Sequence, residues 1–374
     1  MKLTIDKAHL QRGLARLQAI VEKRNSMPIL ANVLLTASGK GKSGTLELAA
    51  TDLEVGVRGV QEADIAKTGA ITVSARKFYD IVRELPDEAV SLEASANNYL
   101  EIKCGRARFS LAGTDAEEYP SLPEFSPERL VRLQSAVLSQ MIERTMYATS
   151  IDETRYNLNG VYFEVTEGTD KIRLVATDGH RLALIDRSVG EEASNLASGV
   201  IIPRKGLAEL KRLVDEEDAD EIELGFEGSS GLARKGGVTL VMRLIEGEFP
   251  NYHQVIPKDA SLKITLPTEP LVRALRRVAL LSAERSRAIK LELSSGQLQI
   301  SSSNPDLGEA SEEVDVDYDG ETISMGFNAK YLLEGISALG AKEISLSLRD
   351  GNAPAEIRPT DDEDSLAVVM PMRL

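Results

Sequence analysis

Short motifs recur along the chain at a nearly constant interval, and this internal repetition restricts the fold more than any other feature. One series consists of the dipeptides Thr51-Asp52, Thr177-Asp178 and Asn304-Pro305. A second, independent series consists of Lys77, Lys205 and Lys330. The intervals are 126 and 127 residues in the first series and 128 and 125 in the second, within a chain of 374 residues. Three copies of one unit predict an extended or closed array of three similar domains.

Each copy contains two helical patterns and several strand patterns. Apolar residues at spacings of three and four predict helices over 7–24, 75–85, 135–149, 203–214, 270–285 and 328–338. Alternating segments such as Val161–Val165 and Leu291–Leu293 predict strands. We therefore predict an α+β fold in which two helices pack on antiparallel sheet in every copy. Proline-rich turns place the domains at 1–125, 126–256 and 257–374.

The composition favours a reducing compartment. Cys104 is the single cysteine, so an internal disulfide is excluded, and its strand-like surroundings favour a buried structural thiol over a reactive one. The first residues, MKLTIDKAHL, lack the apolar core of a secretory signal. No stretch approaches the roughly 18 uninterrupted apolar residues of a membrane span. We expect a cytoplasmic location and no membrane partner.

Charge is divided unevenly between the predicted helices and the rest of the chain. The net charge is −15, yet the six helical segments contain 18 basic and 7 acidic residues. These segments therefore carry +11 and the remainder carries −26. A basic helical face attracts a polyanion without reading its bases, and an acidic exterior repels it. The pattern favours a protein through which duplex DNA passes; the alternative is that ordinary solvated helix faces are basic.

The strongest catalytic-looking element is the segment Thr177–Arg181. Asp178 and His180 are the kind of pair that a general base or a metal site uses. However, the chain has three histidines and no metalloprotease, serine-hydrolase, phosphate-loop or paired-cysteine motif. Asp178-Gly179 between two strand patterns also predicts a turn. We expect no catalytic residue and no bound metal, and we keep a metal-dependent hydrolase using Asp178 and His180 as the alternative. A triplicated scaffold that never meets DNA is a third class, which the helix charges disfavour.

Several longer segments resemble the bacterial beta sliding clamp family, the beta subunit of DNA polymerase III. They include MPIL at 27–30, ATDLEV at 50–55, VATDGHRLA at 175–183, GFNAKYL at 326–332 and the C-terminal VMPMRL. The resemblance extends from Met1 to Leu374 in the order of the family's motifs. The sequence departs from the common pattern at Asn157, where tyrosine is frequent, and at His253-Gln254, where basic residues are frequent. The acidic run Asp361–Asp364 also lengthens the last hairpin.

The resemblance implies a DNA sliding clamp, which is a non-catalytic processivity factor without a cofactor. In this family, two subunits of three domains each join head to tail into a closed ring with helices inside and sheets outside. The implied partners are encircled duplex DNA, a second copy of the chain, the replicative polymerase catalytic subunit and an ATP-driven clamp loader. Other replication and repair proteins are expected to bind through short peptides, at replication forks on the nucleoid.

Two sets of site residues follow from charge and from the resemblance. The helix charges predict sequence-independent phosphate contacts by Arg24, Lys77, Arg204, Lys205, Lys211 and Arg276. A subunit interface is expected between a basic edge of copy one and an acidic, apolar edge of copy three. Its predicted residues are Lys103, Arg106, Arg108, Phe109, Leu280, Leu281, Glu309, Glu312 and Glu313. The alternative is a pair of ordinary edge strands protected by charge.

The resemblance places a partner-binding site on segments that are distant in sequence. They contribute Arg155, Leu158, Thr177, Gly179, His180, Arg181, Leu182, Pro250, Val255, Val369, Met370, Pro371, Met372 and Arg373, with Asn328 and Tyr331 at the rim. Leu, Val, Pro and flexible Met side chains suit a surface that repacks around different peptides, and His180 and Arg181 offer donors. The alternative is that the C-terminal tail is only the last core strand, with Val368 and Met370 facing inward.

Overall fold

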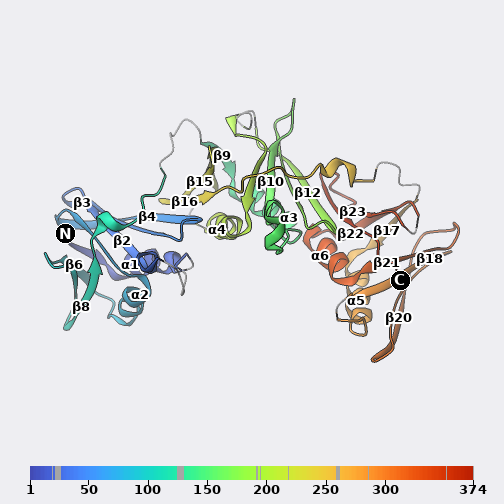
Figure 1. Ribbon diagram of the computed structural model, residues 1–374, viewed down its shortest axis with the longest axis horizontal. Helices are drawn as coiled ribbons and strands as arrows, with labels where there is room; N and C mark the ends of the chain where they lie inside the picture. Colours follow the sequence, from blue (N-terminus) through green and yellow to red (C-terminus); the bar gives the residue numbers. More distant parts are fainter. Residues whose placement is uncertain are drawn as a thin grey trace. The chain divides into compact units, whose positions relative to one another are not determined.

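The computed structural model describes residues 1–18, 20–21, 27–123, 130–190, 193, 195–217, 219–257, 262–284, 286–350 and 352–373. Within them each sequence copy contains two α-helices and eight strands, so the predicted α+β repeat is confirmed (Figure 1). The first copy contains β1 (Lys2–Asp6), α1 (Lys7–Leu17), β2 (Asn32–Ser38), β3 (Gly41–Thr51), β4 (Val55–Lys67), β5 (Gly69–Ser74), α2 (Ala75–Glu84), β6 (Ala89–Ala94), β7 (Tyr99–Cys104) and β8 (Ala107–Thr114).

The other two copies repeat this order of elements. The second contains β9 (Val131–Gln134), α3 (Ser135–Met146), β10 (Gly160–Val165), β11 (Lys171–Thr177), β12 (Arg181–Ser188), β13 (Val200–Pro203), α4 (Arg204–Val214), β14 (Glu221–Glu227), β15 (Ser230–Lys235) and β16 (Val238–Arg243). The third contains β17 (Leu262–Pro267), α5 (Thr268–Ala279), β18 (Ala288–Ser294), β19 (Gln297–Asn304), β20 (Gly308–Asp315), β21 (Ile323–Asn328), α6 (Ala329–Leu339), β22 (Glu343–Leu348), β23 (Ala355–Pro359) and β24 (Ser365–Val369).

The six predicted helices are present, with ends that differ from the predicted ones. Helix α1 ends at Leu17 rather than at residue 24, and α5 extends from Thr268 to Ala279 rather than over 270–285. In α5 the helix begins before Pro270, which is tolerated there because the amide groups of a first turn have no intrahelical partner. None of the described helices is long and apolar enough to span a membrane.

The chain forms two compact units, and the central copy is divided between them. Unit one comprises Met1–Ser135 and Ala208–Leu244, and unit two comprises Ala136–Leu207 and Ile245–Leu374. In unit one, β16 pairs antiparallel with β4, so β9 and β14–β16 extend the sheet of the first copy. In unit two, β12 pairs antiparallel with β24 and joins β10–β13 to the third copy. The three predicted domain ranges stay a prediction, because strand pairing continues from one copy into the next.

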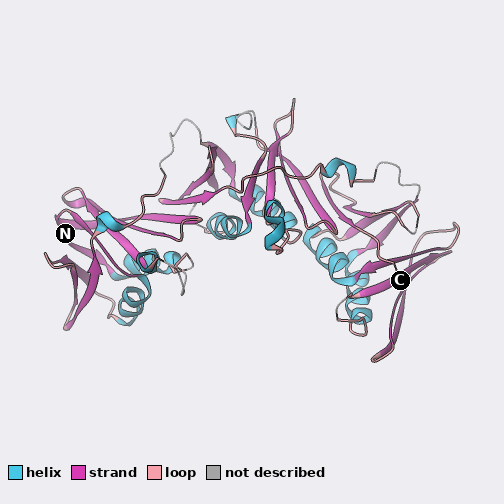
Figure 2. Cartoon of the chain, viewed as in Figure 1, coloured by secondary structure: helices cyan, strands magenta, loops and turns pink. Residues whose placement is uncertain are grey.

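Unit two also contains a separate four-stranded sheet in the order β20-β19-β18-β21. Helices α5 and α6 lie side by side against it (Figure 2). Ile289 and Leu291 of β18 point into the core beneath the helices together with Leu275 and Ile336. Because side chains alternate along a strand, the polar residues between them lie on the opposite face of the sheet.

Two buried polar side chains show how the chain satisfies groups that burial would otherwise leave without partners. The ammonium of Lys235 is almost fully buried and donates to the carbonyl oxygens of Val214 (2.7 Å) and Glu216 (2.5 Å), so it caps the C-terminal end of α4. The thiol of Cys104 is buried and donates to the carbonyl oxygen of Pro86 at 3.5 Å. The predicted burial of Cys104 is therefore confirmed.

The acidic turn between β23 and β24 attaches the third copy to the second within unit two. Asp362 accepts hydrogen bonds from Arg144 of α3 and Arg187 of β12, both at 2.5 Å. Lys171 of β11 donates to both carboxylate oxygens of Asp364 at 2.8 Å. Burial opposes ionisation, but hydrogen bonds from Arg187 and its neighbours hold the pKa of Asp362 below its usual value. The acidic run Asp361–Asp364, which departs from the family pattern, therefore contributes a cluster of ion pairs.

Replacing Asp362 by asparagine is expected to lower the free energy of unfolding by about 2 kcal/mol, because two arginines lose their charged acceptor. A carboxylate with a lowered folded-state pKa stabilises above its unfolded pKa of about 3.9 and loses that contribution as the pH falls further. The difference in melting temperature between wild type and Asp362→Asn should thus be constant from pH 8 to pH 5 and should shrink only below about pH 4. The exposed Asp361→Asn is the control. Equal melting temperatures of the two variants at pH 7 would contradict the prediction.

Candidate functional site

The segment Thr177–Arg181 forms a tight turn between β11 and β12. Asp178 Oδ1 accepts from the backbone amides of His180 (2.9 Å) and Arg181 (3.1 Å). Thr177 Oγ1 accepts from the amide of Gly179 at 3.1 Å and donates to the carbonyl oxygen of Arg181 at 2.7 Å. Gly179 has a φ of 87°, which favours glycine. The sequence Thr-Asp-Gly therefore suits this turn.

The same turn chemistry explains the first series of repeated motifs. In the first copy, Thr51 Oγ1 donates to the carbonyl oxygen of Val55, and Asp52 Oδ1 accepts from the amide of Val55 at 2.7 Å. In the third copy, Asn304 Oδ1 accepts from the amide of Asp306 at 3.0 Å. The repeat at these positions thus preserves a side chain that organises a turn.

The geometry gives no support to catalysis or metal binding by Asp178 and His180. Asp178 Oδ2 accepts from Arg181 Nε at 3.0 Å, so both carboxylate oxygens already hold the turn. The exposed imidazole lies 3.9 Å from Asp178, beyond hydrogen-bonding distance. In the part of the chain that the structure describes, no three His, Cys, Asp or Glu side chains gather at a spacing that would hold a metal ion. The turn interpretation of Asp178-Gly179 is confirmed.

Arg181 lies beneath this turn and joins three elements of unit two. Its side chain is 8% exposed, and its guanidinium carbon lies over the rings of Tyr147 and Tyr331, 5.3 and 4.6 Å from their centroids. The guanidinium donates to Asp178, to Glu334 of α6 and to the carbonyl oxygen of Tyr147. Burial opposes its charge, yet the two carboxylates raise the pKa of Arg181. Arg181 therefore supports the turn from below, and its donors are engaged within the chain.

A second arginine approaches the turn from the 3₁₀ segment Glu153–Leu158. Arg155 Nη1 donates to the carbonyl oxygen of Asp178 at 3.0 Å, and its Nε donates to Asp152 at 3.2 Å. In the same segment, the Asn157 side-chain amide donates to the carbonyl oxygen of Glu248 at 2.9 Å. Asn157, which departs from the family pattern, therefore holds the backbone just before Phe249-Pro250.

The C-terminal tail leaves β24 and crosses two neighbouring elements. The amide of Met370 donates to the carbonyl oxygen of His180 at 2.9 Å, and the amide of Met372 donates to that of Gly326 at 2.8 Å. Met370 is 37% exposed and Pro371 is half-buried. Asn328, close to Gly326, caps α6 by accepting from the amide of Lys330 at 2.9 Å. The tail therefore forms a ledge at the surface, next to the turn that presents His180.

A hollow of about 500 Å³ lies beside this ledge, within the size range of ligand-binding pockets. Val255 and Met370, which the sequence predicted, line it together with residues that it did not predict. The additional lining residues are His253, Gln254, Ile256, Pro257, Arg349, Ala353 and Pro354. The stretch 253–257 lies next to a predicted residue, whereas nothing in the sequence indicated that the turn after β22 approaches it.

The predicted partner-site residues fall into two groups by exposure. Those that reach the surface, wholly or in part, are Arg155, Gly179, His180, Pro250, Val255, Asn328, Tyr331, Met370, Pro371, Met372 and Arg373. Those that are buried are Leu158, Thr177, Arg181, Leu182 and Val369. Leu182 packs with Val175, Tyr252 and Val368 in a small core beneath the segment that contains Phe249. The buried group supports the surface, so a peptide contact by its side chains is not expected.

The structure describes five of the six residues predicted to face DNA. Lys77 on α2, Arg204 on α4 and Arg276 on α5 are exposed, and Lys205 is half-buried. Lys211 forms an ion pair with Asp215, which directly follows the last residue of α4. Arg24 lies outside the described residues.

The residues predicted at the subunit interface lie on or beside two strands that each have an open edge, β8 and β20. Lys103 lies on β7, Arg106 lies in the turn before β8, and Leu280 and Leu281 follow α5. Strand β8 pairs with β7 along its length, but with β5 only at Gly113 and Thr114. Strand β20 pairs in the described structure with β19 alone and ends its sheet. Phe109 on β8 is 40% exposed, and Leu280 after α5 is 76% exposed. The hydrogen bond from Arg277 lowers the pKa of Glu312 on β20.

Models of three domains from one protein family match the chain in order. The N-terminal domain of the DNA polymerase III beta subunit matches residues 1–123, the central domain 132–251 and the C-terminal domain 253–373. The chain belongs to the DNA polymerase III beta subunit family. The three-domain clamp fold and the resemblance described from the sequence motifs are thus confirmed.

Relatives in this family are similar over their whole length. The chain is 39% identical to the beta sliding clamp of Pseudomonas putida and 36% identical to that of Escherichia coli, and each comparison covers 100% of both chains. Among solved structures, a sliding clamp from Caulobacter crescentus has a TM-score of 0.93 at 38% identity, again over 100% of both chains. A sliding clamp from Pseudomonas aeruginosa bound to griselimycin has a TM-score of 0.92 at 37% identity over 100% of both chains.

Proposed function

We propose that this chain is a DNA sliding clamp, a processivity factor that encircles duplex DNA and tethers a replicative polymerase. The observation that carries this proposal is the ordered match of three clamp-domain models to nearly the whole chain. The protein then acts as an accessory subunit without catalytic residues of its own. The hydrolase alternative has no support, because Asp178 is occupied in organising a turn.

Retention on closed DNA tests this function directly. The purified protein is loaded onto nicked circular duplex by a bacterial clamp loader with ATP, and the complex is isolated by gel filtration. We expect the protein to co-elute with the circle and to be released when a restriction enzyme linearises it, because a ring slides off a free end. Retention after linearisation would contradict an encircling mode, and failure to associate with the circle would contradict the function.

A closed ring requires two copies of the chain, each with domains near the ranges 1–125, 126–256 and 257–374. Basic residues lie on β8 and on the hairpin that leads into it, with Lys103 near the end of β7, Arg106 in the turn and Arg108 on β8, and the acidic edge of β20 carries Glu309 and Glu313. An interface between unlike edges is heterologous and closes when two copies complete a rotation. Pairing of two exposed edge strands also satisfies backbone groups that would otherwise remain open to aggregation. We therefore propose a head-to-tail homodimer.

The exposed basic residues of the helices are proposed to contact phosphate rather than bases. Single substitutions Lys77→Ala, Arg204→Ala and Arg276→Ala should each change the retention half-life on a closed circle by less than about twofold. A surface charge contact contributes little by itself, and retention depends on topology. On short linear duplex, direct binding should weaken steeply with salt and be equal for unrelated sequences. A strong sequence preference in a fluorescence anisotropy assay would overturn this assignment.

Short peptides of partner proteins are proposed to bind at the ledge formed by the tail, in the adjacent Val255 hollow and beside the turn that presents His180. Most of the side chains that line the hollow are apolar, and the exposed His180 supplies a polar group next to Met370, which lines it. Flexible methionines on the tail suit several ligands in turn. The proposed ligands are peptides from the polymerase catalytic subunit, the clamp loader and other replication and repair proteins.

A further inference from the structure

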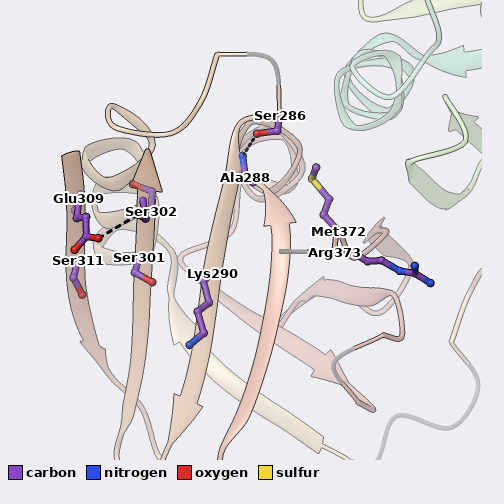
Figure 3. Close-up of a pocket in the computed structure, with 11 residues that line it drawn as sticks. Ser286, Ala288, Lys290, Ser301, Ser302, Glu309, Ser311, Met372 and Arg373 are labelled. Carbon is purple, nitrogen blue, oxygen red and sulfur yellow. Dashed lines mark hydrogen bonds between the residues drawn. The ribbon is translucent and has the colours of Figure 1, made fainter. Parts of the chain in front are cut away.

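A broad groove crosses the outer face of the four-stranded sheet, on the side opposite α5 and α6. Its volume is about 730 Å³, larger than that of the Val255 hollow. Small side chains, chiefly serine and alanine, line most of it (Figure 3). Met372 and Arg373 of the C-terminal tail form one side, and Glu309 of β20 lies at the other. The residues predicted for the partner site include the tail but, of this sheet, only Asn328 of β21, which does not line the groove.

Strand register explains the groove. Met372 pairs with Gly326 of β21, Gly326 with Lys290 of β18, Lys290 with Ser301 of β19, and Ser301 with Ser311 of β20. These partners form one row across the sheet, and residues in such a row share a face. Because the row contains a glycine and two serines, little side-chain volume fills the surface above it. Four steps of about 4.8 Å span roughly 19 Å, the length of about six residues of extended peptide.

The groove is continuous with the proposed peptide site through the tail. Met370 lines the Val255 hollow, and Met372, two residues further on, lines the groove. A bound peptide that leaves the hollow over Pro371 therefore enters the groove directly. The side next to the tail carries two basic residues, the exposed Arg373 and Lys290, whose ammonium pairs with Glu292 at 2.6 Å. The far side is negatively charged at Glu309.

We propose that this groove holds a flank of the same partner peptide, about six residues long and acidic where it leaves the tail. Arg373 and Lys290 attract that acidic part, and the hydroxyls of Ser301 and Ser311, which both donate and accept, bind the polar backbone of the flank. The inference rests on the proposed peptide site, which it extends to a second, charge-selective contact. Partners with an acidic flank are thereby favoured over partners that share the same apolar core.

The test compares five synthetic peptides by fluorescence anisotropy. They are an apolar peptide from a polymerase catalytic subunit and the same peptide extended by three aspartates or by three lysines, at one end or at the other. Aspartates at one end should tighten binding about fivefold at low salt, and lysines should not, because two exposed ion pairs contribute modestly. The gain should disappear in Lys290→Gln and in Ser301→Trp, whereas binding of the unextended peptide should be unchanged.

The control is Ser324→Trp, an exposed residue of β21 that does not line the groove and that should leave the gain intact. Melting curves of the three variants establish that each is folded. The inference is overturned if aspartates give no gain at either end, or if the gain persists in both Lys290→Gln and Ser301→Trp. A wild-type protein that does not bind even the unextended peptide would instead refute the proposed peptide site.

Discussion

Replacing both Leu280 and Leu281 by alanine is expected to convert the proposed dimer into monomers. Leu280 is 76% exposed directly after α5, where a large apolar side chain is costly in water unless a partner covers it. Leu281 is half-buried beside it. Each truncation at the centre of an interface costs about 2 kcal/mol, so the two together should raise the dissociation constant roughly a thousandfold.

Multi-angle light scattering at micromolar concentration measures the outcome. Leu53→Ala provides a matched control. Like Leu280, Leu53 is an exposed leucine just after a secondary-structure element, but it is not predicted at the interface. The control should remain dimeric, and the double variant should elute at half the mass with an unchanged circular dichroism spectrum. A dimeric double variant would remove this surface from the interface. In that case the edges of β8 and β20 would be ordinary protected edge strands.

The repeated architecture could be predicted from the sequence because its signals are local. Spacings of three and four predicted each helix, and the recurrence of Thr-Asp predicted equivalent positions before any contact was known. The turn at Asp178-Gly179 was predictable for the same reason, since its hydrogen bonds join residues within three positions of one another. Pairing of β4 with β16 and of β12 with β24 was not predictable, because nothing local specifies which edges meet.

The role of Arg181 shows where sequence reasoning fails at the site. Its place in a turn motif suggested a donor for a peptide, but Tyr147, Tyr331 and Glu334 surround it and engage its guanidinium. Glu334 is 153 residues away in sequence, and one sequence does not reveal such a partner. The same holds for Asn157, which binds a backbone oxygen 91 residues away.

Deleting residues 370–374 is expected to weaken binding of polymerase-type peptides by at least about thirtyfold. The deletion removes Met370 from the hollow and the ledge beside His180, and a central apolar anchor contributes about 2 kcal/mol or more. Strand β24 ends at Val369 and keeps its pairing with β12 and β23. The folded protein loses two backbone hydrogen bonds, from Met370 and Met372, at about 1 kcal/mol each.

The deletion therefore separates the two interpretations of the tail. A binding ledge predicts a dimer that melts within a few degrees of the wild type and no longer binds the peptide. A last core strand predicts a broad loss of stability, but the exposure of Met370 already disfavours an inward-facing side chain. Met370→Ala should reproduce part of the loss of affinity, and Met27→Ala, an exposed methionine of the other unit, should not. A truncated protein that is folded, dimeric and binds the peptide with unchanged affinity would show that partners dock elsewhere, because no ledge would then remain for them to contact.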